Sequence, residues 1–206
     1  MDAADIARLA THSPRLSLGV DLDAHLRLLR KDATCKGLFI ADALAILKRA
    51  HPAEDACALA EIPARRYVPF LDYPYGDYLR AVVAAARRGF SGRSLGEGVF
   101  SIGRAAYGAF AENRVGKVLF GALGRDFDRI AELGTRGWQV SANFGSVRYV
   151  PLARRRAAYV FREFPAFLET LQAGVVQGAM DATQTKGEVS VHLDDLQTGV
   201  IEMRWE

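Results

Sequence analysis

Hydrophobic residues recur every three or four positions through most of the first 135 residues, the spacing that places them on one face of a helix. In the segment that begins at Asp77, Leu79, Val82, Val83 and Ala86 share such a face. We therefore predict an amphipathic helix that starts near Asp77. The same spacing predicts helices over residues 21–31, 36–49, 53–60 and 126–135.

A capping signal marks a further helix. Ser94 and Glu97 have the Ser-x-x-Glu spacing in which each side chain bonds the backbone N–H group of the other residue. Hydrophobic residues follow at helical spacing as far as Phe110. Thr34 is a candidate cap for the helix predicted over residues 36–49.

The hydrophobic period changes from 3.6 to two after residue 137. Trp138, Val140, Ala142 and Phe144 alternate with polar residues and predict a half-buried strand. We expect Gly145 and its neighbour Ser146 to form a tight turn into a strand over residues 147–150. Further elements are expected after it: strands over residues 159–164, 188–194 and 200–206, and a helix from Pro165 to Ala182.

These elements predict an α+β fold. A helical N-terminal half is followed by a small antiparallel sheet, made of strands, a helix and a strand hairpin, and packed against helices. We expect residues 1–35 to be a variable leader and residues 36–206 to be a single domain.

Glycines interrupt two of the predicted helices. Each interior glycine costs about 1 kcal/mol of helix stability relative to alanine. Such a cost is typical of close packing against another helix, a subunit or a ligand, and packing is the commoner reason. The glycines to which we assign this role are Gly96, Gly103, Gly174 and Gly178.

Composition narrows the class of protein. Half of the 206 residues are hydrophobic and a quarter are charged, which excludes a disordered chain and a disulfide-rich miniature fold. The sequence has neither a membrane-spanning apolar run nor a secretory signal, so we expect a cytoplasmic protein. Its two cysteines, Cys35 and Cys57, lack zinc-ligand spacing.

Charge is unevenly distributed along the chain. Residues 65–162 contain 17 basic and 7 acidic side chains, whereas residues 163–206 contain 2 and 8. Pairing of the two regions, within the chain or across a dimer, is the favoured explanation. The alternatives are binding of an acidic partner protein, of an anionic membrane, or of nucleic acid or a cyclic nucleotide, although no nucleic-acid-binding motif is present. Binding of nucleic acid or a cyclic nucleotide would use a basic patch of Arg87, Arg88, Arg93, Arg154, Arg155 and Arg156.

Catalytic and cofactor motifs are missing from the sequence. The four histidines are dispersed, and no zinc-protease, nucleophile-elbow, phosphate-loop or dinucleotide-binding pattern occurs. We therefore predict neither catalytic residues nor a metal site nor a cofactor, and a protein that is not an enzyme.

Several segments resemble a family of unknown function with many paralogues in myxobacteria, from about Cys35 to the end of the chain. They include Phe70–Arg80 (FLDYPYGDYLR), Ala85–Phe90 (AARRGF), Leu95–Arg104 (LGEGVFSIGR), Val118–Arg125 (VLFGALGR), Pro165–Thr170 (PAFLET) and Gly174–Gly178 (GVVQG).

More remotely, the order of elements is similar to a superfamily of ligand-binding and trafficking domains. It contains 4-vinyl-reductase-type domains, subunits of the TRAPP vesicle tether and haem nitric-oxide sensors. This resemblance implies a hydrophobic pocket between helices and sheet, and dimerisation through helices. The sensors use a histidine on a helix before the sheet and a Tyr-x-Ser-x-Arg motif. Residues 94–137 contain no histidine and Phe144 stands in the tyrosine position, so we do not expect haem.

The favoured function is a non-enzymatic sensory or adaptor domain that binds a small hydrophobic ligand and signals through a homodimer or a partner protein. An alternative is a protein-interaction module with a filled core and no ligand. Core packing is the commoner explanation for each candidate pocket residue taken alone. These residues are Val99, Ile102, Phe110, Leu119, Phe120 and Phe127.

Overall fold

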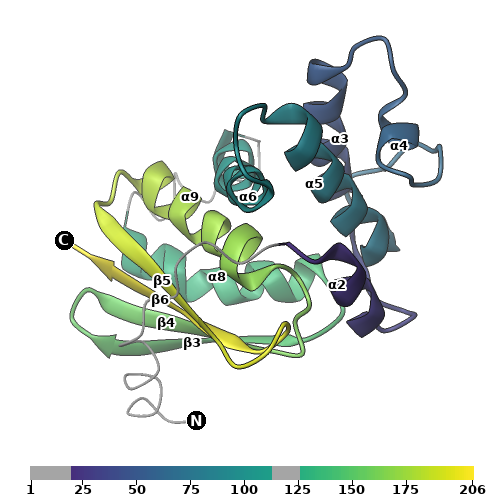
Figure 1. Cartoon of the computed structure of the whole chain (residues 1–206). Helices are drawn as coiled ribbons and strands as arrows, with labels where there is room; N and C mark the ends of the chain where they lie inside the picture. Colours follow the sequence, from purple (N-terminus) through teal and green to yellow (C-terminus); the bar gives the residue numbers. More distant parts are fainter. Residues whose placement is uncertain (1–19, 113–125) are drawn as a thin grey trace.

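The computed structural model describes residues 20–112 and 126–206, with side chains as far as Gly108 in the first range. Helices are gathered on one side of a four-stranded antiparallel sheet (Figure 1), so the predicted α+β class is confirmed. The described helices are α2 (Leu22–Leu28), α3 (Gly37–Ala50), α4 (Ala56–Leu59), α5 (Tyr75–Gly89), α6 (Leu95–Glu112), α8 (Phe127–Ser141), the π-helix η1 (Leu168–Gln172) and α9 (Ala173–Thr183).

The large sheet has the strand order β3-β4-β6-β5. Its strands are β3 (Ser146–Ala153), β4 (Arg156–Arg162), β5 (Gly187–Leu193) and β6 (Gly199–Trp205). Helices α8 and α9 cover one face (Figure 1), which carries the buried side chains of Tyr159, Phe161, Ile201 and Met203. Strands β5 and β6 pair antiparallel, so the strand hairpin predicted at the C-terminus is confirmed.

The opposite face of the sheet holds a buried carboxylate. Glu202 is 1% exposed, and the Nε atoms of Arg156 and Arg204 donate to its Oε1 at 2.7 Å and 2.5 Å. The pairing register places Arg156 opposite Arg204 and Ala158 opposite Glu202 on this face. The two arginines compensate the buried charge. A small apolar cluster of the same face consists of Val150, Ala158, Val160 and Val200.

The capping box is confirmed, and the second predicted cap is wrong. Ser94 N donates to Glu97 Oε2 at 2.8 Å and Glu97 N donates to Ser94 Oγ at 3.3 Å. Thr34 instead lies in β1 (Thr34–Lys36), which pairs with β2 (Asp72–Pro74). Helix α3 begins at Gly37, whose N–H donates to the carbonyl of Leu71 at 2.9 Å, so a distant loop takes the place of a side-chain cap.

The strand predicted from Trp138 to Phe144 is wrong. Residues as far as Ser141 continue α8, and β3 begins at Ser146. Gly145 has a φ of 64° and leads into β3, which pairs with β4 across a turn at residues 154–155. The period-two pattern was misleading because Val140 is 70% exposed, whereas Trp138 faces the sheet from the helix.

The helix predicted from Pro165 begins three residues later than expected. Phe167 has a φ of 50°, in the left-handed region that non-glycine residues rarely adopt, and η1 starts at Leu168. The π-helical turn leads directly into α9. Left-handed residues and π-helical turns are both found often at functional sites.

Helix α2 packs against α5. His25 on α2 is 5% exposed, its ring centroid lies 4.4 Å from that of Phe167, and its Nδ1 donates to the carbonyl of Asp21 at 2.7 Å.

The division of the chain at residue 35 stays a prediction, and residues 1–19 lie outside the described ranges.

Helices α6 and α9 are in very close contact. A Cβ atom at Gly174 or Gly178 would overlap with the carbonyl oxygen of Phe100 or Arg104 on α6, and one at Gly103 would overlap with the carbonyl of Leu171 in η1. At the edge of this contact, Arg104 forms an ion pair with Asp181 at 2.5 Å. The packing therefore brings helix backbones together in place of side chains.

We expect Gly103→Ala to lower the free energy of unfolding by about 1–3 kcal/mol, because the added methyl group meets backbone that has to move. Gly108→Ala is the matched control on the same helix: its Cβ meets no atom of the described residues within 4 Å, so it should be neutral or stabilise by up to about 1 kcal/mol. Chemical denaturation measures both, and equal effects would contradict the close-packing argument.

The buried His25 predicts acid sensitivity. Desolvation by burial lowers the pKa of His25, and the bond to Asp21 offsets only part of this effect. Below a pH of about 6.5, the unfolded chain binds a proton that the folded chain excludes. The free energy of unfolding should therefore fall as pH decreases from there towards the folded-state pKa. His25→Leu should flatten this dependence in denaturation series at several pH values, whereas His192→Gln on the surface should retain it.

Candidate functional site

The described candidate pocket residues are buried in the main core. Val99 and Ile102 lie on α6 with 0% and 5% exposure, and Phe127 at the start of α8 has 4%. Asp126 caps α8 by accepting from Arg129 N at 3.3 Å, which fixes the position of Phe127. The ring of Phe127 packs edge-on against Trp205 of β6 at 5.0 Å. Leu119, Phe120 and the side chain of Phe110 lie outside the described part of the chain.

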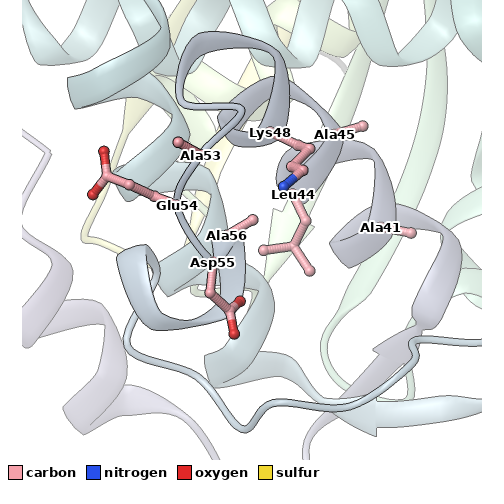
Figure 2. A pocket seen from close by; sticks show the side chains of 8 residues that line it. All are labelled: Ala41, Leu44, Ala45, Lys48, Ala53, Glu54, Asp55 and Ala56. Atoms are coloured by element: carbon pink, nitrogen blue, oxygen red, sulfur yellow. The ribbon is translucent and has the colours of Figure 1, made fainter.

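Among the surface grooves formed by described residues, one lies beside α3 and another beside α6, and neither is lined by Val99, Ile102 or Phe127. One lies between α3 and α4 and is lined by Leu44 and several alanines (Figure 2). The other follows α6 and includes Gly96, Phe100 and Arg104. Gly96 thus borders a surface groove, unlike Gly103, Gly174 and Gly178 in the α6–α9 contact.

A buried polar contact joins α8 to the π-helical turn. Trp138 Nε1 donates to Gln172 Oε1 at 2.7 Å, and Gln172 Nε2 donates to the carbonyl of Ala166 at 3.4 Å. The indole ring packs edge-on against Tyr159 and Phe161, at 4.9 Å and 5.5 Å. We call Trp138, Tyr159, Phe161 and Gln172 the aromatic junction. It fills the space between α8, the sheet and η1.

Gly134 allows Tyr159 to reach the helix backbone. The Tyr159 hydroxyl donates to the carbonyl of Ala131 at 2.5 Å, and a Cβ at Gly134 would come within 2.6 Å of that hydroxyl. Burial raises the pKa of Tyr159 well above its usual value, so the phenol stays protonated. The sequence contained a signal for this site: Phe127, Ile130, Ala131 and Trp138 fall on one face of a helix.

The two arginine groups occupy different parts of the fold. Arg87 and Arg88 are exposed at the end of α5, whereas Arg154 and Arg155 are exposed in the β3–β4 turn, on the opposite side of the view in Figure 1. Arg93 donates to Ser101 Oγ at 2.6 Å, and Arg156 is bound to Glu202. The six arginines are not brought together.

Other chemistry in the described ranges is limited. Burial raises the pKa of the Cys35 thiol to about 12, which leaves it protonated and unreactive. Within residues 20–112 and 126–206, no three His, Cys, Asp or Glu side chains are placed to hold a metal ion. In the same ranges, no helix is both long and apolar enough to cross a membrane.

A family model described as "Protein of unknown function (DUF2378)" matches residues 28–206. The chain belongs to this family. No curated protein matches the sequence. Among solved structures, the fold is similar to a mutant H-NOX protein from S. oneidensis in the Fe(II) state, with a TM-score of 0.66 and 14% identity over 83% of this chain and 96% of that chain.

Other H-NOX structures give the same result. The Fe(II) unliganded protein from K. algicida has a TM-score of 0.63 and 9% identity, covering 83% of this chain and 96% of that one. A mutant H-NOX protein from T. tengcongensis has a TM-score of 0.62 and 14% identity, covering 83% of this chain and 97% of that one. These identities are low enough that the likeness establishes the fold alone. The remote resemblance to the haem nitric-oxide sensor fold is thereby confirmed.

In the positions where the resemblance to haem sensors implies a ligand and a motif, the residues of this chain do not fit haem. Haem iron is usually held by His, Cys, Met or Tyr. Residues 94–137 contain none of the first three. Tyr107 is the single tyrosine there, and burial raises its pKa to about 12, which disfavours an iron-binding phenolate. Phe144, which replaces the motif tyrosine, is 7% exposed and packs on Tyr75 and Phe164, so it presents no polar group.

We expect Trp138→Phe to destabilise the fold by about 1–3 kcal/mol, because Gln172 Oε1 is left buried without its donor. Addition of Gln172→Leu to this variant should cost less than Gln172→Leu costs alone. Trp205→Phe is the control: it makes the same substitution on the same sheet face and leaves the Trp138–Gln172 hydrogen bond in place. Additive effects in thermal or urea unfolding would contradict the coupling.

Proposed function

We propose that this chain is a non-enzymatic sensory or adaptor domain of the cytoplasm that binds a small hydrophobic ligand without haem. The observation that carries the proposal is the shared fold: 83% of the chain superposes on nearly the full length of H-NOX domains, while the side chains for haem are missing. A retained fold with altered chemistry is typical of a changed ligand.

The proposed ligand site lies among the buried apolar side chains of α6 and α8 around Val99, Ile102 and Phe127. Phe110, Leu119 and Phe120 are its further proposed lining residues. These side chains offer dispersion and hydrophobic contacts but no hydrogen bonds, so the ligand class is apolar. In this proposal, binding alters the α6–α9 contact and is communicated through a second subunit or a partner protein.

The free thiols support the proposed compartment. Cys35 and Cys57 are both unpaired. Unpaired thiols are usual in the reducing cytoplasm, where disulfides seldom persist.

A protein-interaction module without a ligand is the second candidate. It is favoured by the burial of Val99, Ile102 and Phe127 in one continuous core. Nucleic-acid binding is not proposed, because the arginine groups lie on separate parts of the fold and Arg156 is already paired with Glu202.

Native mass spectrometry of the purified protein, followed by solvent extraction, tests the proposal. We expect one apolar molecule bound to each chain, no haem absorbance band, and saturable binding of a fluorescent fatty-acid probe to protein from which that molecule has been removed. A stoichiometric haem would contradict the proposal. An apo mass together with no saturable probe binding would favour the interaction module.

Two matched variants locate the site. Ile102→Phe adds volume at the proposed ligand site and should reduce probe binding, since the added ring takes up space needed by the ligand. Ile40→Phe makes the same change at a fully buried position on α3 and should leave binding intact in the folded protein. Circular dichroism confirms folding of each, and equal probe affinities would place the site elsewhere.

A further inference from the structure

The loop before β2 exposes two large hydrophobic side chains. Phe70 is 75% exposed and Leu71 is 57% exposed. Exposure of adjacent large apolar side chains is unfavourable in a protein that stays monomeric, and it often marks an interaction surface. We call Phe70 and Leu71 the knob.

The loop that carries the knob is held rigidly by its backbone. The Tyr73 hydroxyl accepts from Val68 N at 2.9 Å and donates to the carbonyl of Arg66 at 3.2 Å. The first two N–H groups of α3 donate to the carbonyls of Leu71 and Pro69, at 2.9 Å and 3.1 Å. Such a loop is preorganised, so binding through its side chains costs little ordering entropy.

The loop packs tightly against the start of α3. A Cβ at Gly37 would overlap with the carbonyl of Val68, so glycine is required where the loop crosses the helix start. The charges around the loop are largely paired: Lys36 with Asp72 at 2.8 Å, and Arg65 with Asp77 at 2.9 Å. This balance favours a protein surface over an anionic membrane as the occupant.

A groove suited to the knob lies further along the same helix. It runs between α3 and α4, with a floor of small and aliphatic side chains: Ala41, Leu44, Ala45, Ala53 and Ala56. In Figure 2, Leu44 lies within the groove, while the carboxylates of Glu54 and Asp55 point away from it. Lys48 Nζ donates to the carbonyl of Pro52 at 2.8 Å and holds the turn that closes the groove. We call this the α3 groove.

Knob and groove are spaced along α3 in a way that makes the surface self-complementary. The knob loop binds the first turn of α3 at Gly37, and the groove is centred near Leu44. Gly37 and Leu44 are seven residues apart, which is about 10 Å along the helix axis. If two α3 helices pack antiparallel about a twofold axis near Ala41, each knob meets the other chain's groove, as an isologous contact requires.

Charge supports the same arrangement. Arg66 is exposed in the loop that carries the knob, and Glu54 and Asp55 are exposed at the rim of the α3 groove. The twofold relation brings Arg66 of one chain towards the carboxylates of the other. The small side chain of Ala41 allows the two helices to approach at the axis.

We propose that the α3 surface is a homodimer interface in which Phe70 and Leu71 of each chain occupy the α3 groove of the other. The inference rests on the proposed function only in taking subunit contacts as the route of signalling. Self-association is measured without ligand. A monomeric protein would therefore not contradict the ligand proposal, and a protein without a ligand would not contradict the proposed dimer.

Sedimentation velocity over a wide concentration series of the full chain tests the interface. We expect a reversible dimer for the wild type. Phe70→Ser should weaken it by about tenfold or more, as loss of a buried aromatic anchor does. Ala41→Arg should have a similar or larger effect, because two cations meet at the axis. Val140→Ser is the control, since it removes an equally exposed apolar side chain from α8.

A disulfide experiment tests the twofold geometry independently. In a Cys57→Ser background, Ala41→Cys should form a covalent dimer with oxidised glutathione, because a residue near the axis faces its own copy within disulfide reach. Val140→Cys in the same background should form much less. A chain that stays monomeric at every concentration, or a dimer that tolerates both Phe70→Ser and Ala41→Arg, overturns the proposal.

Discussion

Helices α6 and α9 approach each other through backbone at Gly174 and Gly178, where a side chain on α9 would overlap with carbonyl oxygens of α6. This contact fixes the distance between the helical half of the chain and the sheet, because α9 lies on the sheet and α6 lies on α9. Gly98 extends the same principle outwards: its Cβ would lie 3.0 Å from Ala86 of α5. Helices α5 and α3 are positioned in turn, so the knob and the α3 groove depend on this packing.

The aromatic junction is the second constraint on the fold. Trp138, Tyr159 and Gln172 come from α8, β4 and η1, and each has its polar atom bonded inside the protein. A buried polar contact of this kind specifies one arrangement of the three elements, because any shift leaves a donor or acceptor unpaired. The left-handed Phe167 and the π-helical turn hold Gln172 at the required position.

The comparison with H-NOX domains separates fold from chemistry. This chain shares the fold, yet residues 94–137 contain no His, Cys or Met, and burial raises the pKa of Tyr107, the single tyrosine there, to about 12. Fold is determined by core packing, which tolerates many sequences of similar pattern, whereas ligand chemistry depends on a few side chains. An identity of 9–15% is therefore compatible with the same architecture and a different ligand.

The elements that could be predicted from the sequence are those with local signals: the α5 and α6 faces, the Ser94–Glu97 capping box and the C-terminal strand hairpin. Helical spacing and turn residues act within a few positions, so they are readable in one dimension. The helical conformation of Trp138 could not be predicted in this way, because it depends on tertiary contacts: its hydrogen-bond partner Gln172 is 34 residues away. The tertiary structure also decided that α3 is capped by a loop, and that Phe70 and Leu71 are exposed, because each depends on contacts between segments distant in the chain.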